Sequence, residues 1–364
     1  MKKVCIFCGE QPKSKNLEHV IPQWLIELNG SPKQIGEFGY INLGDGKFVK
    51  RRFSVNAFKF PSCRKCNQEF EKLEASVKVI VSKMMLEDSL SESELDSLLD
   101  WFDKVRIGLW LGYLYLDENP LGIRPIFYIK NRIRKEDRIL AIFKAEGNRK
   151  ELMGVGCNTP AFVKTPSCFS LRINNLWFLN MSYPYLLANR MGFPFPTDNY
   201  MGEDGLAYCY LNEGRNRIMK PVLGKEMRIK GTELYQAIFI KDIGCEADEG
   251  VRRMYDTKYV RDNCISWEEG IGGVFIRSDS EVSRYDSSPS MEWLPKRTYD
   301  LEELDVGIRS LTLEWQSYIT ENLLPSLEFI SGDRKKREVK FRNYAREYNR
   351  ELVERLSSEK RYLF

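Results

Sequence analysis

The chain has 364 residues, of which 43% are hydrophobic and 12% aromatic, and its 56 lysines and arginines nearly balance 52 acidic residues. This composition can build a buried core, which excludes an intrinsically disordered protein. No stretch approaches about 18 consecutive apolar residues, so we expect neither a membrane span nor a membrane partner. The N-terminus also lacks the apolar run of a signal peptide, and we therefore expect a cytoplasmic protein.

The charge is distributed unevenly along the chain. Residues 1–83 contain 15 basic and 8 acidic residues, and residues 331–364 contain 11 basic and 6 acidic residues. Between them, residues 84–122 contain 9 acidic and only 2 basic residues. Basic ends are typical of a protein that binds a polyanion. Charge alone fits solvated helix faces equally well.

Two cysteine pairs near the N-terminus form the first strong pattern. Cys5 and Cys8 make one C-x2-C pair, and Cys63 and Cys66 make another. Four thiolates in two close pairs predict a structural zinc site. The alternative, four unrelated thiols, does not explain the repeated spacing. The remaining five cysteines have no paired spacing and are expected to be ordinary core thiols: Cys157, Cys168, Cys209, Cys245 and Cys264.

The segment between the two pairs contains the only histidine of the chain, His19, in the run LEHVIP of residues 17–22. Residues 39–55 alternate apolar and polar side chains around a GDG turn, which predicts a hairpin. After the second pair, a helix is predicted to begin near Asn67, with Asn67 as its N-cap. The apolar residues at helical spacing are Phe70, Leu73, Val77, Ile80 and Met84.

The ordered set CIFCG, LEHVIP and CRKCN resembles the HNH, or ββα-metal (His-Me finger), endonucleases. The likeness is greatest to the zinc-stapled branch of that family, which includes phage recombination endonucleases, and it covers about the first quarter of the chain. It implies a metal-dependent endonuclease that hydrolyses phosphodiester bonds in DNA, with RNA not excluded. The thiolates of Cys5, Cys8, Cys63 and Cys66 would hold zinc and take no part in the chemistry.

The resemblance also implies roles for individual residues. His19 is the general base, and an imidazole suits that role because it titrates near neutral pH. Glu18 and Asn67 match the positions that ligate a hydrated Mg²⁺ or Mn²⁺ ion, and their oxygens suit such a cation. Glu18 stands where Asp is more usual in the family. Asn56 is the nearest candidate for the asparagine that steadies the histidine loop, although it lies slightly upstream of the usual position.

Two further glutamates follow on the predicted helix. Glu71 and Glu74 come four and seven residues after Asn67, on about the same helix face. They are expected either to support the metal site from behind its ligands or to face solvent.

A boundary is predicted after residue 88, where the sequence becomes acidic and rich in serine. We expect an α+β protein, with a zinc-bound ββα-metal nuclease domain at residues 1–88 and a larger mixed α/β domain at residues 89–364. The second domain should begin with a mostly buried helix over about residues 94–116, capped by Ser91 or Ser93. Strands are expected at 123–129, 138–145, 167–173, 176–181, 233–240 and 273–277, with an irregular surface at 183–200.

Two long helices are predicted at residues 300–328 and 333–360. They are expected to dock on the second domain, or else to form a homodimer contact or an arm that faces DNA. The second domain would position the substrate, bind a regulatory ligand or protein partner, or support dimerisation. A nuclease joined to a large unrelated domain resembles the layout of bacterial anti-phage effectors.

Two other functions stay open at this point. The first is a zinc-stapled module that binds nucleic acid without cutting it. The second is a ligand-sensing interaction protein, in which aromatic segments such as Trp177-Phe178 line a pocket. Mg²⁺-dependent cleavage would separate the endonuclease from both alternatives, and salt-dependent binding without cleavage would identify the first.

Overall fold

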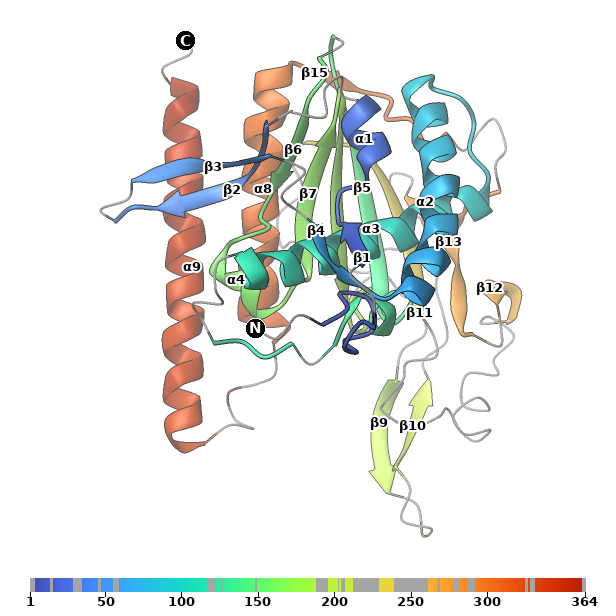
Figure 1. Cartoon of the computed structure of the whole chain (residues 1–364). Coiled ribbons are helices and arrows are strands. Elements are labelled where there is room, and N and C mark those ends of the chain that lie inside the picture. Colours follow the sequence, from blue (N-terminus) through green and yellow to red (C-terminus); the bar gives the residue numbers. More distant parts are fainter. Residues whose placement is uncertain are drawn as a thin grey trace.

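The computed structural model describes residues 4–13, 16–28, 35–44, 47–54, 59–116, 122–125, 127–147, 149–187, 196–201, 203, 207–211, 229–238, 261–266, 269–277, 282–286, 292–324, 327 and 331–361. Figure 1 shows a central sheet between helices, with the C-terminal helix at the outer edge of the molecule. Within the described residues, no helix has both the length and the apolar character needed to cross a bilayer.

The central sheet contains strands from both predicted domains. Its main path runs β12-β13-β11-β5-β8-β7-β6-β2-β3, while β14 pairs with β13 and β15 pairs with β5. The β2–β6 and β15–β5 pairs are parallel, and the other pairs of this sheet are antiparallel. The bounds are β2 Ile35–Asn42, β3 Phe48–Ser54, β5 Asp137–Ala145, β6 Leu152–Val155, β7 Cys168–Ile173, β8 Leu176–Tyr183, β11 Thr232–Ile238, β12 Cys264–Ser266, β13 Ile271–Arg277, β14 Val282–Arg284 and β15 Thr298–Tyr299.

Helices cover both faces of this sheet. Leu140 and Ile142 of β5 belong to the core that contains α2 (Arg64–Met85) and α3 (Glu92–Leu116). Ile139, Ala141 and Phe143 of the same strand belong to a second core with α8 (Leu301–Asn322). The alternation follows from the two-residue period of a strand, and it makes β5 a buried central strand. Further helices of the described residues are α4 (Pro160–Lys164), α9 (Gly332–Arg361) and the 3-10 helix η2 (Ile129–Asn131).

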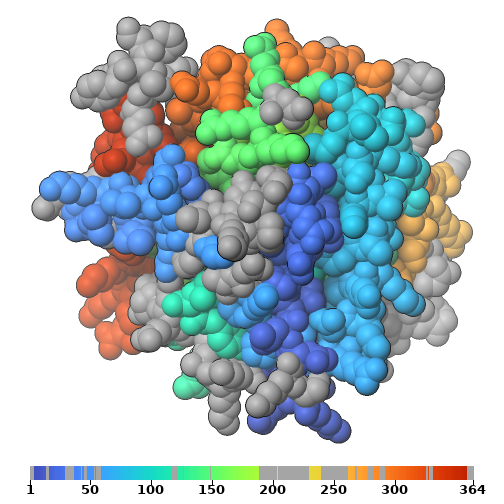
Figure 2. All heavy atoms as spheres, turned by 45° about the horizontal axis from the view of Figure 1, so that its top comes forward, coloured from blue at the N-terminus to red at the C-terminus, as the bar shows by residue number. Residues whose placement is uncertain are grey.

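A small ββα unit lies beside the large sheet. Strand β1 (Asn16–His19) pairs with β4 (Lys59–Ser62) in a separate antiparallel sheet, and α2 follows β4 directly. Helix α1 (Gln23–Leu28) comes after β1. The predicted hairpin is present as β2 and β3, but it leaves this unit and extends the large sheet at β6. In Figure 2 the hairpin and α2 lie at opposite sides of one face, with the N-terminal segment between them.

Several expectations about the fold are confirmed. The protein is α+β, and it ends in two long helices, α8 and α9. Ser91 caps α3 as predicted: its Oγ accepts from the Glu94 amide at 3.2 Å, and the Glu94 carboxylate accepts from the Ser91 amide at 2.8 Å. This reciprocal capping box satisfies two backbone donors that the helix itself cannot pair. The division at residue 88 stays a prediction, although one hydrophobic core contains residues from both sides of it.

Other expectations are wrong. The described part of 123–129 forms no strand, and Pro125 lacks the amide that a ladder needs. The end of the stretch expected to be irregular instead forms β9 (Pro196–Met201), which pairs with β10 (Ala207–Leu211). Asn67 is not the N-cap of α2: the cap is Cys63, whose carbonyl accepts from the Asn67 amide at 3.0 Å. The cap therefore lies four residues earlier than predicted, and Asn67 is the fourth residue of the helix.

Candidate functional site

The four predicted zinc ligands come together. The Sγ atoms of Cys5, Cys8, Cys63 and Cys66 all lie within 4.8 Å of one another. Cys8 Sγ and Cys63 Sγ are 3.9 Å apart. Tetrahedral zinc with Zn–S bonds of about 2.3 Å needs sulfur–sulfur separations of about 3.8 Å, so the thiols fit this ion. The cluster joins the N-terminal knuckle to the first turn of α2.

The knuckle depends on the glycine that follows its second thiol. Gly9 has a φ of +78°, in the left-handed region that glycine adopts without strain. A Cβ on Gly9 would also lie only 2.2 Å from the ring of Tyr128. The CIFCG motif therefore needs glycine at this position for both its backbone and its packing.

The pKa values of three of the four thiols are shifted, and these shifts affect metal binding. Burial raises the pKa of Cys8 to about 11 and also raises the pKa of Cys66. Burial acts in the same direction on Cys63, but hydrogen bonds from the Cys66 amide and the neighbouring thiols outweigh it and lower the Cys63 pKa. Zinc binds thiolates, so its binding must displace protons from Cys8 and Cys66, whose pKa values are raised.

Strand β1 presents Glu18 and His19 at its end. In the register with β4, Glu18 lies opposite Phe60 and His19 opposite Lys59. Successive side chains of a strand point to opposite faces, so the Glu18 and His19 side chains leave β1 on different sides. Phe60 is buried in the core shared with α2 and α3, which places Glu18 on the side of these helices. His19 is half-buried.

Glu18 is paired with a lysine from outside the N-terminal quarter. Its Oε1 lies 2.8 Å from Nζ of Lys104 on α3, whose side chain is only 1% exposed. The same Nζ donates to Oε1 of Glu74 on α2. Glu74 also accepts from the indole N–H groups of Trp24 at 2.8 Å and Trp101 at 3.2 Å. Glu74 therefore does not face solvent, while Glu71 is exposed.

The charges of this cluster are strongly coupled. Burial raises the pKa of Glu18, and the ammonium of Lys104 opposes that rise. Burial alone would lower the pKa of Lys104, but the Glu74 and Glu18 carboxylates outweigh it and raise the pKa. Lys104 is therefore a buried cation shared by two carboxylates. No sequence pattern singled out Lys104, although it is one of only two basic residues between positions 84 and 122.

Asn67 lies beside a depression between β1 and α2. Its Oδ1 accepts from Ser62 Oγ at 3.3 Å, which ties the first turns of α2 to the end of β4. The depression has a volume of about 450 Å³, and its lining residues are Asn16, Leu17, Arg64, Asn67 and Gln68. Leu17 is 58% exposed, so the depression opens to solvent. It offers amide and guanidinium groups next to the strand that carries Glu18 and His19.

The remaining sequence predictions concern Asn56 and the five other cysteines. Asn56 lies outside the described residues. Cys157 and Cys168 are buried core thiols, and burial raises the pKa of both. Cys264 is half-buried, the side chain of Cys209 is not described, and Cys245 lies outside the described residues.

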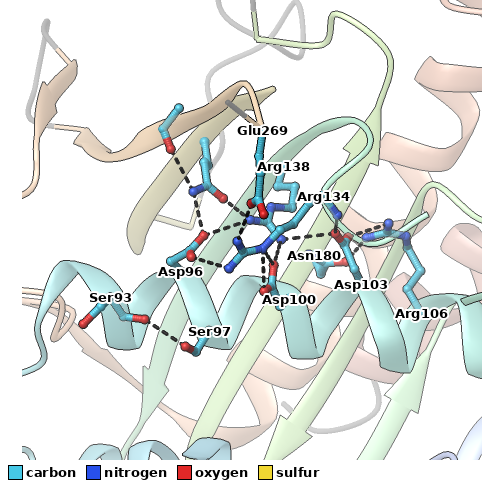
Figure 3. Close-up of polar contacts among 12 residues, drawn as sticks. Ser93, Asp96, Ser97, Asp100, Asp103, Arg106, Arg134, Arg138, Asn180 and Glu269 are labelled. Carbon is cyan, nitrogen blue, oxygen red and sulfur yellow. Dashed lines mark hydrogen bonds and ion pairs between the residues drawn. The ribbon is translucent and has the colours of Figure 1, made fainter. Parts of the chain in front are cut away.

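A second charged cluster lies on the neighbouring face of α3. Figure 3 shows Asp96, Asp100 and Asp103 of α3 facing arginines that approach from the sheet. Arg138 of β5 pairs with all three carboxylates, and Arg134 pairs with Asp96 at 2.6 Å and Asp100 at 2.7 Å.

This ion-pair network is internally compensated. Arg106 pairs with Asp103 at 2.7 Å and also donates to Asn180 of β8. The side chains of Arg106, Asp103 and Arg138 are fully buried. Each carboxylate has a guanidinium partner, so the network fixes α3 on the sheet and offers no charge to a ligand.

Comparison with known proteins identifies no relative. No family model, no curated protein and no solved structure matches this chain. The site therefore has to be interpreted from its own residues, among which the four-cysteine cluster is a candidate metal centre.

Proposed function

We propose that this protein is a metal-dependent endonuclease that hydrolyses phosphodiester bonds in DNA. One observation carries the proposal: the cysteine cluster holds β1, with Glu18 and His19, beside the helix that carries Asn67. Three motifs that are distant in sequence thus meet in one ββα unit. This is the arrangement that the resemblance to the HNH endonucleases implies.

Each residue has a distinct role in this proposal. His19 takes a proton from the attacking water, since imidazole is a suitable base near neutral pH. Glu18 and Asn67 would hold a Mg²⁺ or Mn²⁺ ion, whose charge stabilises the phosphate oxygens in the transition state. Arg64 and Gln68 line the adjoining depression and are positioned to contact the phosphate backbone. The zinc cluster has a structural role only.

The larger part of the chain is proposed to position the substrate or to hold the nuclease in check. Its helix α3 already contributes Lys104 to the cluster around Glu18. An anti-phage effector would have such a layout, with a signal acting on the part that restrains cleavage.

The test is cleavage of a supercoiled plasmid by the zinc-loaded full chain, with Mg²⁺ or Mn²⁺ added or omitted. Wild type should nick the plasmid only with the added cation, and His19→Ala should not. Lys59→Ala is the matched control, because Lys59 lies opposite His19 in the same ladder and the proposed mechanism assigns it no role. Equal nicking by His19→Ala and wild type, at equal zinc content, would exclude His19 as the base.

One observation favours the non-catalytic alternative. The Glu18 carboxylate already has a buried ammonium at 2.8 Å, which compensates its charge without a divalent ion. A zinc-stapled module that binds nucleic acid without cutting it would tolerate that pairing. Salt-dependent DNA binding by wild type, with no cleavage under any divalent cation, would establish this alternative.

A further inference from the structure

We propose that the first half of α9, residues 332–344, is a docking surface for the phosphate backbone of nucleic acid. The inference concerns a surface separate from the ββα unit, and it does not need cleavage to occur. The positive charge of α9 by itself indicates a polyanionic ligand. The choice of nucleic acid among polyanions rests on the proposed function.

The two halves of α9 differ in how they meet the rest of the protein. In the second half, Tyr348, Leu352 and Leu356 form a buried core with residues of α8 and of the β2–β3 hairpin. The Tyr348 hydroxyl donates to the Tyr40 carbonyl at 3.3 Å. Ala345 is buried as well. This half therefore anchors the helix by ordinary packing.

The first half meets the body of the protein at α4. Lys164 of α4 pairs with Glu338 at 2.9 Å and lies 5.1 Å from the ring centroid of Phe341. Every residue from 331 to 337 is exposed. The start of α9 is therefore exposed to solvent. Figure 1 shows this helix at the edge of the molecule.

The exposed half carries uncompensated positive charge. Residues 333–342 contain six basic and two acidic residues, a net charge of +4. Glu338 is already shared by Lys164 and Arg342, and Asp333 makes only a 3.7 Å surface contact with Lys336. Among the described residues, no carboxylate pairs with the other four cations of this segment, which are Arg334, Lys335, Arg337 and Lys340.

Three of the lysines share one helix face with an exposed aromatic ring. This face lines an open depression of about 810 Å³, and its residues are Gly332, Lys335, Lys336, Val339, Lys340, Asn343, Tyr344 and Glu347. From 332 to 344 the helix rises by about 18 Å. Lysine ammonium groups bind phosphates as point charges, and the half-exposed Tyr344 ring can pack against sugars or bases.

The same features disfavour two other occupants. A second copy of this chain would bring two like-charged faces together, which repel. A lipid bilayer needs a continuous apolar face to insert, and the exposed apolar side chains here are Val339 and Tyr344 alone among the described residues. A phosphate backbone needs only cations along a line, and it gains free energy from counterion release.

The experiment measures binding of a fluorescein-labelled 30-base-pair duplex by anisotropy, without divalent cations, at several salt concentrations. The variant is Lys335→Gln/Lys336→Gln/Lys340→Gln in the full chain. We expect binding at least about tenfold weaker at low salt, with a salt slope smaller by about 2 to 3, since each lost phosphate contact removes about 0.9 from that slope.

The matched control is Arg346→Gln/Arg350→Gln on the same helix. Arg346 lies 3.9 Å from Glu321, and Arg350 pairs with Glu347 and Glu354, so these cations are already compensated. The control should bind DNA like wild type. Because all five substituted residues are exposed, both variants should keep the wild-type thermal midpoint, which checks that each is folded.

Three results would overturn the inference: unchanged affinity and slope in the lysine variant, lysine-dependent binding to vesicles of 30% phosphatidylserine in place of DNA, or a dimer that the lysine variant loses. Weaker DNA binding by the lysine variant, with no Mg²⁺-dependent nicking by wild type, would uphold the docking surface and reject the endonuclease. Nicking by wild type with normal DNA binding by the variant would do the reverse.

Discussion

Lys104 Nζ lies 2.8 Å from Glu18 Oε1, although the two residues are 86 positions apart in the chain. The lysine comes from a helix that is fixed to the large sheet, and the glutamate comes from the ββα unit. The contact therefore links the candidate catalytic strand to the rest of the fold.

Replacing Lys104 should destabilise the protein strongly. Lys104→Met leaves Glu18 and Glu74 as buried carboxylates without a cation, and breaking such a pair costs about 3–5 kcal/mol. The free energy of unfolding from urea titration measures this loss. Lys130→Met is the control, because Lys130 forms an exposed pair with Glu69 and should change stability by less than about 1 kcal/mol. Equal losses in the two variants would contradict the assignment of Lys104 as a buried bridging cation.

Zinc should be bound at one ion per chain and released on acidification. The pKa of Cys8 is raised to about 11 by burial, so zinc must displace a proton from this thiol at neutral pH. Falling pH favours the protonated thiol, and the apparent zinc affinity should drop by about tenfold per pH unit for each displaced proton. Elemental analysis gives the stoichiometry, and a colorimetric indicator follows release between pH 8 and pH 5.

The matched substitutions for the zinc site are Cys66→Ser and Cys157→Ser. Cys66 is one of the four clustered thiols, and Cys157 is a buried thiol outside the cluster. Only Cys66→Ser should lose zinc. Retention of a full equivalent by this variant would place the metal elsewhere.

Replacing Arg138 should lower the free energy of unfolding much more than replacing an exposed arginine. Arg138 is fully buried and pairs with Asp96, Asp100 and Asp103, so Arg138→Met leaves carboxylates that the remaining arginines only partly compensate. We expect a loss of about 3–5 kcal/mol in the free energy of unfolding. Arg149→Met, at an exposed position beside Glu151, should lie within about 1 kcal/mol of wild type.

His19→Ala should lower the rate of plasmid nicking by about 10²–10⁴-fold, the usual contribution of a general base. Zinc content should stay at the wild-type level, because the candidate zinc ligands are the four clustered thiols. A rate within tenfold of wild type would assign the base to another group.

Local patterns in the sequence predicted much of the fold. The two C-x2-C pairs predicted the four-cysteine cluster, and the turn at residues 44–46 predicted the β2–β3 hairpin. Ser91, one of the two predicted caps, indicated the start of α3. Each of these signals depends on residues that are neighbours in the chain or share one repeated spacing.

The missed features depend on contacts between distant segments. The hairpin pairs with β6 of the large sheet, and nothing within its own residues selects that partner. Lys104 is one charge in a mostly apolar helix, and its carboxylate partners lie 30 and 86 positions away. The chain places Cys63 at the N-cap of α2, four residues before the predicted Asn67, because the helix follows β4 with only one residue between them.

Helix α3 contacts two parts of the fold through neighbouring faces. One face is bound to the sheet through the network of Asp96, Asp100 and Asp103, and the adjacent face supplies Lys104 and Trp101 to the glutamates of the ββα unit. A fragment that ended at residue 88 would keep both glutamates and lose the cation between them. The ββα unit therefore depends on α3, and in another protein it would need a substitute for that helix.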